Sequence, residues 1–187
     1  MTSNETKIVV LNGKSFDRTM THFGLDADLG DMDELKKLAE FNNLISASFA
    51  GTNLDDIGLD HVCKVTSIED LNLQWTDISD EGLRSLAKLP RLATLRLKEN
   101  DQLTNACTPH LRKLANLTDL QIHGTSIDQR GLQELICLKN LRDLCIEPEN
   151  CGNVFEAANA LSLLMPACTI LVKGRGQFHN GMFTGKW

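Results

Sequence analysis

A pattern of leucines recurs along most of this chain with a period of about 24 residues. The pattern is clearest in residues 68–91, IEDLNLQWTDISDEGLRSLAKLPR, and residues 117–140, LTDLQIHGTSIDQRGLQELICLKN, are nearly a second copy. In both copies apolar residues occupy the same positions. A unit of this length cannot bury its apolar face alone and buries it against neighbouring copies. The sequence therefore predicts a solenoid of stacked repeats.

Six repeats and a closing strand account for residues 20–172. The first five repeats span residues 20–43, 44–67, 68–91, 92–116 and 117–140. The fourth repeat carries one extra residue around Glu99–Gln102, and the sixth, which begins at Leu141, is longer and irregular. The closing strand is expected over Thr169–Lys173. An atypical last copy is expected because terminal repeats must face solvent.

Segments without the repeat lie at both ends of what we treat as one domain of residues 1–187. Residues 1–6 are polar and are expected to be poorly ordered. Residues 7–19 contain Asn12-Gly13, a strong signal for a two-residue turn, and predict a hairpin that caps the first repeat. Residues 173–187 are rich in glycine and include Phe178, Phe183 and Trp187. They form either a cap over the last repeat or a free tail.

Two spacings inside each repeat predict local structure. Leu71 and Leu73 alternate with a polar residue, as in a strand with one buried face, and the leucines of residues 83–89 define an apolar helix face. Helix N-caps are expected just before that face at Asp31, Asp55, Ser79, Thr104 and Asp128. A second column, Thr52, Thr76 and Thr125, places a hydroxyl where it can satisfy turn amides in neighbouring coils. A third column, Gly58, Gly82 and Gly131, predicts close approach of helix and strand.

These residues resemble the leucine-rich repeat family, over roughly residues 20–172. The chain is most similar to the bacterial 24-residue repeats that read T-x-I-x-D-x-G-L, relatives of the cysteine-containing repeats. The resemblance implies an α/β fold, a right-handed superhelix with a parallel sheet on the concave face and short helices on the convex face. It also implies a function in protein–protein recognition. No F-box, kinase or ligase segment accompanies the repeats.

Composition narrows the classes of function. The net charge of −6 and the isoelectric point near 5.3 argue against a nucleic-acid partner, because neutralising phosphates requires a basic face. The start of the chain does not resemble a signal peptide, and no apolar run approaches the length of a membrane span. The six cysteines lack the paired spacing of a zinc site. We therefore expect a cytoplasmic monomer with reduced cysteines and no cofactor, and Cys151 and Cys168 are the pair that the irregular last repeat can bring together.

The outward strand positions predict where a protein partner binds. In the predicted register these positions form columns across the sheet, and the middle repeats carry the large aromatic and basic residues. Trp and Arg are enriched among the residues that dominate binding energies. The predicted site consists of Asn72, Gln74, Trp75, Arg96, Lys98, Gln121 and His123. The alternative for Trp75 is that it packs on the rim between coils.

Two other classes of function remain open. A hydrolase would need an acid–base group and a nucleophile, and the pattern places Cys145 near His123. No metal set or phosphate loop accompanies that pair at a persuasive spacing, so we predict a binding module and not an enzyme. A self-assembling or structural module would use the glycine-rich and aromatic residues 174–187 as its contact.

Overall fold

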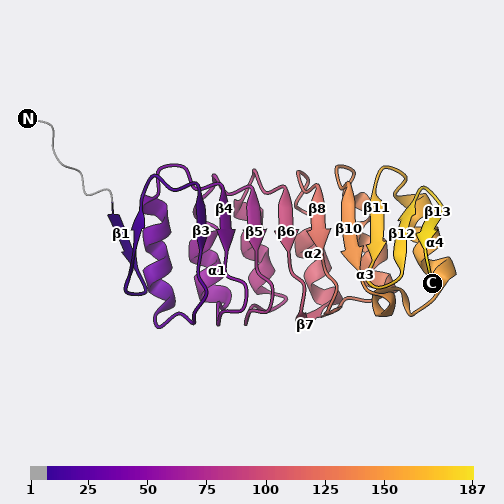
Figure 1. The fold of residues 1–187 in the computed structure, drawn as a ribbon, viewed down its shortest axis with the longest axis horizontal. Coiled ribbons are helices and arrows are strands. Elements are labelled where there is room, and N and C mark those ends of the chain that lie inside the picture. The colour runs from indigo at the N-terminus through magenta and orange to yellow at the C-terminus, as the bar shows by residue number, and fades with distance from the viewer. Residues whose placement is uncertain (1–7) are drawn as a thin grey trace, which may run out of the picture.

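The computed structural model describes residues 8–187. The expectation for residues 1–6, and Lys7 at the start of the predicted hairpin, lie outside the described residues. Figure 1 shows the repeats arranged side by side, with strands along one face and helices behind them. The two ends of the chain lie at opposite ends of this row.

The described residues contain one large sheet of nine strands in the order β3-β4-β5-β6-β8-β10-β11-β12-β13. The strands from β3 to β11 are parallel, and they follow one another along the chain. Their bounds are β3 (His22–Gly24), β4 (Ser46–Ser48), β5 (Asp70–Asn72), β6 (Thr94–Arg96), β8 (Asp119–Gln121), β10 (Asp143–Ile146) and β11 (Thr169–Val172). One strand per repeat therefore enters the sheet, with the closing strand at the predicted place.

Short helices cover one face of this sheet (Figure 1). The α-helices are α1 (Asp56–Val62), α2 (Thr108–Leu111), α3 (Gln129–Glu134) and α4 (Phe155–Leu164). The 3₁₀ helices are η1 (Met32–Glu40), η2 (Gly82–Lys88), η3 (Asn105–Cys107), η4 (Leu135–Cys137) and η5 (Pro148–Cys151). In η2, Leu83 and Leu86 are buried at a spacing of three residues, which matches the three residues per turn of a 3₁₀ helix.

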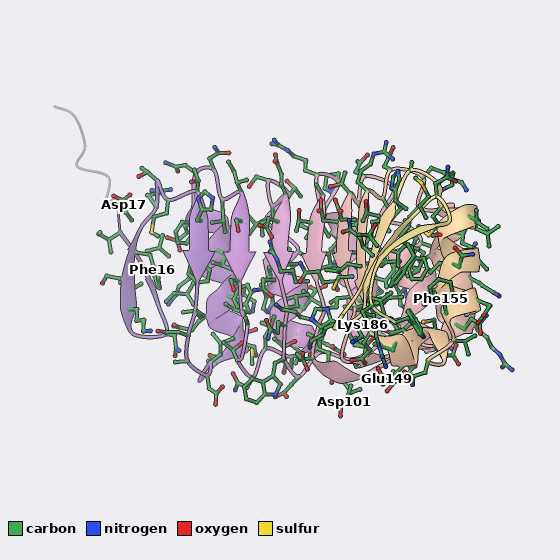
Figure 2. All side chains as sticks on the ribbon, turned by 45° about the vertical axis from the view of Figure 1, so that its right-hand side comes forward. Phe16, Asp17, Asp101, Glu149, Phe155 and Lys186 are labelled. Atoms are coloured by element: carbon green, nitrogen blue, oxygen red, sulfur yellow. The ribbon has the colours of Figure 1, made fainter. Side chains whose placement is uncertain are left out.

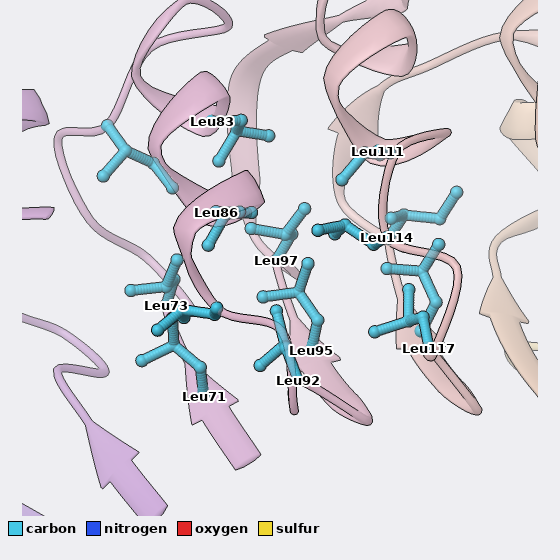
Figure 3. Packing of buried hydrophobic residues seen from close by; sticks show 14 of the residues in the cluster. Leu71, Leu73, Leu83, Leu86, Leu92, Leu95, Leu97, Leu111, Leu114 and Leu117 are labelled. Atoms are coloured by element: carbon cyan, nitrogen blue, oxygen red, sulfur yellow. The ribbon is translucent and has the colours of Figure 1, made fainter. Parts of the chain in front are cut away.

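The repeated leucines form one continuous core between the strands and the helices. Leu71, Leu73, Leu83 and Leu86 are each fully buried, and Figure 3 shows them packed beside leucines of the next repeat, among them Leu95, Leu97 and Leu111. The cluster of buried residues extends from the N-terminal hairpin to the C-terminal one. Because every repeat packs against its neighbours, the core is shared along the whole row.

All five predicted helix caps accept a backbone hydrogen bond through the side chain. Asp31, Asp55, Thr104 and Asp128 are N-caps that accept from amides in the first turn. The fifth, Ser79, lies two residues before the assigned cap of η2, and its hydroxyl accepts from the N–H of Gly82 at 3.2 Å. The caps therefore confirm the predicted register of the repeats.

The structure corrects two predictions about the turns. The hydroxyls of Thr52, Thr76 and Thr125 each donate to the carbonyl three residues earlier in their own coil. Of the three, Thr76 also contacts a neighbouring coil, since its hydroxyl lies 3.5 Å from Oδ1 of Asn100. At the recurring glycine position the nearest atom belongs to the preceding coil at Gly82 and Gly131, and to the same coil at Gly58. A Cβ on Gly82 would lie 1.9 Å from Oδ1 of Asp56, because that carboxylate of the preceding coil binds Ser79.

The extra residue of the fourth repeat lies near β7 (Asn100–Thr104), at the edge of the sheet where the parallel strands end. There β7 pairs in parallel with β9 (Thr125–Ser126), with a register shift between Asn100 and Thr104. The buried side chain of Asn100 donates to the carbonyl oxygen of Leu73 at 2.7 Å and accepts from the amide of Thr76 at 2.9 Å. These bonds tie the fourth repeat to the third.

Hairpins stand at both ends of the row. At the N-terminus, β1 (Ile8–Leu11) and β2 (Lys14–Asp17) pair around Asn12 and Gly13, whose φ angles of 48° and 72° fit the predicted turn. At the C-terminus, β12 (Gly176–His179) and β13 (Met182–Gly185) add to β11 in antiparallel fashion.

The aromatic residues of the C-terminal hairpin pack inward. The rings of Phe178, Phe183 and Trp187 surround Phe155 of α4 with centroid distances of 5.1, 5.2 and 5.4 Å. Figure 2 shows Phe155 at this end of the molecule and Phe16 at the other. The rings that a self-assembling tail would offer to a second copy are thus engaged within the chain.

No helix in residues 8–187 is long and apolar enough to cross a membrane. All six cysteines are free thiols, Cys151 and Cys168 included.

Candidate binding surface

The face of the sheet opposite the helices presents the predicted columns of outward residues. In the strand register Asn72 lies between Ser48 and Arg96, and Arg96 lies between Asn72 and Gln121. The structure therefore brings together the predicted site residues of β5, β6 and β8.

The next predicted column continues beyond the strand ends. The carbonyls of Gln74, Lys98 and His123 accept hydrogen bonds from the preceding repeat, at 2.9, 3.2 and 3.0 Å. The donors are the amides of Gly51, Trp75 and Glu99. These bonds extend the ladder of the sheet by a further step, so the three residues follow the strands in register.

Arg96 is held by an ion pair inside the face. Its Nη1 lies 2.6 Å from Oδ1 of Asp70 on the neighbouring strand, and both side chains are about two-thirds buried. A guanidinium that already has a carboxylate partner contributes less to the binding energy of an incoming ligand than a free guanidinium would. We therefore do not regard Arg96 as the centre of the surface.

His123 is buried although it belongs to the outward column, with 8% of the residue exposed. Its Nδ1 lies 3.3 Å from Sγ of Cys145 on β10, so the pair that the pattern suggested does form. Lys173, just after β11, reaches across to Glu99 with an Nζ–Oε1 distance of 3.0 Å. The His123–Cys145 contact and the Lys173–Glu99 ion pair thus join residues of four successive strands.

The electrostatic environment keeps both members of the His123–Cys145 pair neutral. Burial lowers the pKa of His123, and the ammonium of Lys173 lowers that pKa further. Burial also raises the pKa of the Cys145 thiol. A nucleophilic cysteine requires the opposite, a lowered thiol pKa beside a protonated imidazole. The arrangement supports a structural contact more than a catalytic pair.

Trp75 follows the end of β5 by three residues and has an unusual backbone conformation. It occupies the turn after β5 with a φ of 51°, a left-handed backbone conformation that is uncommon for a residue other than glycine. The equivalent residues of the neighbouring repeats, Gly51, Glu99 and Gly124, also have positive φ angles. Trp75 therefore lies at the rim of the sheet, and 72% of it is exposed.

An open groove of 920 Å³ runs along the carboxyl ends of the strands beside Trp75. It is lined by the turns after β5, β6 and β8 and by Glu147. A second hollow of 370 Å³ lies on the other side of Trp75 and is lined by residues that include Asp28 and Gly51. Figure 2 shows Asp101, one of the groove residues, at this lower edge. Trp75 thus separates two hollows on the rim of the sheet.

The groove residues Asp77 and Asp101 were not predicted from the sequence. Both are exposed, and among residues 8–187 no hydrogen bond or ion pair engages either carboxylate. The available signal was their place between a sheet strand and the following helix, since the segments after parallel strands meet at one edge of a sheet. Within residues 8–187, no group of three or more His, Cys, Asp or Glu residues is placed to hold a metal ion.

Comparisons with known proteins support the fold. Among solved structures, the chain is similar to an internalin from Listeria monocytogenes, with a TM-score of 0.51 and 18% sequence identity. The chain has a leucine-rich-repeat-like fold. The match covers 81% of this chain and 55% of the internalin chain, so this chain spans about half the length of that neighbour. No protein-family model matches the sequence, and no curated protein matches it.

Proposed function

We propose that the chain is a non-enzymatic binding module, an α/β solenoid that recognises a protein partner at the rim of its sheet around Trp75. In this proposal residues 7–19 and 173–187 cover the two ends of one domain. The adjoining concave face, with Asn72, Gln74 and Gln121, provides the remaining contacts. The leucine-rich-repeat-like fold supports an interaction module in general.

One observation carries the proposal, the combination of exposure and backbone conformation at Trp75. A non-glycine residue with positive φ is uncommon, and two of the equivalent residues in this chain are glycines. A residue that is both conformationally unfavourable and 72% exposed contributes little to folding. Large aromatic side chains dominate many interfaces because they bury much area with few rotatable bonds. A binding role accounts for both features.

The other predicted residues have supporting roles in this proposal. Arg96 is paired with Asp70, and His123 is in contact with Cys145. These contacts fix the positions of both side chains on the face next to Trp75. Lys98 is half-buried and follows β6 on the same face. We expect the partner to contact its ammonium at the border between face and rim.

Capture from a lysate of the source cells tests the proposal. The immobilised chain is compared with Trp75→Ala and with Ile57→Ala, a matched control that removes another exposed apolar side chain, 60% exposed, on α1. We expect Trp75→Ala to lose the captured protein and Ile57→Ala to retain it. Equal capture by the parent and Trp75→Ala contradicts the proposal.

A further inference from the structure

The hollows on both sides of Trp75 are strongly acidic. Their lining includes Asp28, Asp77, Glu99, Asp101 and Glu147, and no Lys, Arg or His side chain. Carboxylates of one sign around a cleft attract ligands of the opposite charge and raise their rate of association. The occupant that this lining favours is therefore cationic.

The five carboxylates are not equivalent. Glu99 is paired with Lys173, Asp28 accepts from the amide of Asn53, and the Glu147 side chain accepts from a backbone amide of η5. Asp77 and Asp101 lack such partners within the described residues, and both are exposed. These two carboxylates can accept hydrogen bonds from a ligand without losing any bond inside the chain.

The Trp75 indole adds a binding element of a different kind. Its exposed ring stands between the hollows, and a guanidinium stacks on such a ring through cation–π attraction. The other tryptophan of the chain already engages an arginine in this way, since Cζ of Arg175 lies 5.8 Å from the centre of the Trp187 ring. Arginine suits the groove better than lysine because its planar group can stack on Trp75 and form paired hydrogen bonds with a carboxylate.

We propose that the groove binds an arginine-containing basic segment of the protein partner, with one guanidinium on Trp75 and others paired with Asp77 and Asp101. This inference rests on the proposed function and names the chemistry of the partner. A neutral polysaccharide also stacks on exposed tryptophan, but it would make no use of a lining with five carboxylates and no cation.

Binding of a labelled hexa-arginine peptide to the full chain, followed by fluorescence anisotropy, tests the inference. The site variant is Asp77→Asn with Asp101→Asn. The matched control is Glu40→Gln with Glu156→Gln, which changes the net charge equally at two exposed carboxylates outside the groove. We expect the site variant to bind about tenfold more weakly than the control, as the loss of two partly solvated charge pairs implies. We also expect weaker binding by Trp75→Ala, and hexa-lysine to bind more weakly than hexa-arginine.

Equal weakening by the site variant and the control would mean that the peptide responds only to overall charge, and it would overturn the inference. Displacement of the peptide by a neutral glucan hexasaccharide at lower concentration would overturn it as well. Either result leaves the proposed function intact as long as Trp75→Ala still loses the captured partner. If Trp75→Ala captures the partner as well as the parent does, the proposed function itself fails.

Discussion

The indole of Trp75 packs over Gly51, which occupies the same turn position one repeat earlier. A Cβ built on Gly51 would lie 3.8 Å from Cε3 of Trp75, an ordinary van der Waals separation, so the ring lies directly beside the Gly51 backbone. Both residues have positive φ angles, 72° at Gly51 and 51° at Trp75. The same left-handed turn is thus unstrained at Gly51, which is a glycine, and strained at Trp75. Trp75 is also the most exposed large apolar side chain of the described residues.

This relationship predicts that two small substitutions at Trp75 affect stability unequally. Trp75→Gly and Trp75→Ala both remove the indole, but only glycine relieves the left-handed backbone. We expect Trp75→Gly to be about 1 kcal/mol more stable than Trp75→Ala. Urea unfolding of the two variants measures the difference. An alanine variant at least as stable as the glycine variant would contradict the φ angle and the strain derived from it.

The sequence predicted the repeat register well because that register depends on local periodicity. The positions of the leucines determine which residues face the core, and a polar residue before each helix caps it, as at Asp55 and Thr104. The outward columns, including Asn72 beside Arg96, follow directly from that register.

The details of the candidate surface could not be predicted because they depend on long-range geometry. A positive φ at a tryptophan has no signature in residue type, so the sequence does not predict the turn conformation at Trp75. The ion pair of Glu99 with Lys173 joins residues 74 positions apart, and the burial of His123 depends on such cross-strand neighbours. The groove exists only once the turns of neighbouring repeats are stacked.

A charge in the shared core should unfold the chain. Leu120 is 1% exposed and lies between Leu95 and Leu144 in the strand register. Leu120→Asp buries an unpaired carboxylate there and should cost more than about 4 kcal/mol. Gln121→Asp, its outward neighbour, is the matched control and should remain folded. Circular dichroism during thermal unfolding distinguishes them, and a cooperatively folded Leu120→Asp protein would refute the register.

Stability should fall in mild acid partly because of His123. Burial holds the pKa of His123 in the folded protein below its unfolded value of about 6.5. As the pH falls through that unfolded value, the unfolded chain binds a proton that the folded chain resists, so the free energy of unfolding decreases. Urea unfolding between about pH 7.5 and 5.5 should show a smaller loss for His123→Gln than for the parent. Identical losses in both proteins would show that His123 is not held neutral.

The six thiols should react at very different rates in the folded protein. Cys137 is exposed and should be modified first, and Cys145 is half-buried beside His123. Burial raises the pKa of Cys63, Cys107 and Cys168 to about 12, which removes the reactive thiolate. Mass spectrometry after brief alkylation should find one label, mostly on Cys137, and the denatured chain should take six. Labelling of Cys63 as fast as Cys137 would contradict the burial of that thiol.

The affinity of Trp75→Gly for the captured partner tests the rim as the binding site most directly. This variant loses the indole but keeps the turn, so binding and folding are separated in one molecule. We expect the dissociation constant to rise about thirtyfold, which corresponds to about 2 kcal/mol, while the melting temperature stays within a few degrees of the parent. An affinity equal to that of the parent, in a variant that is fully folded, would contradict the central role of Trp75.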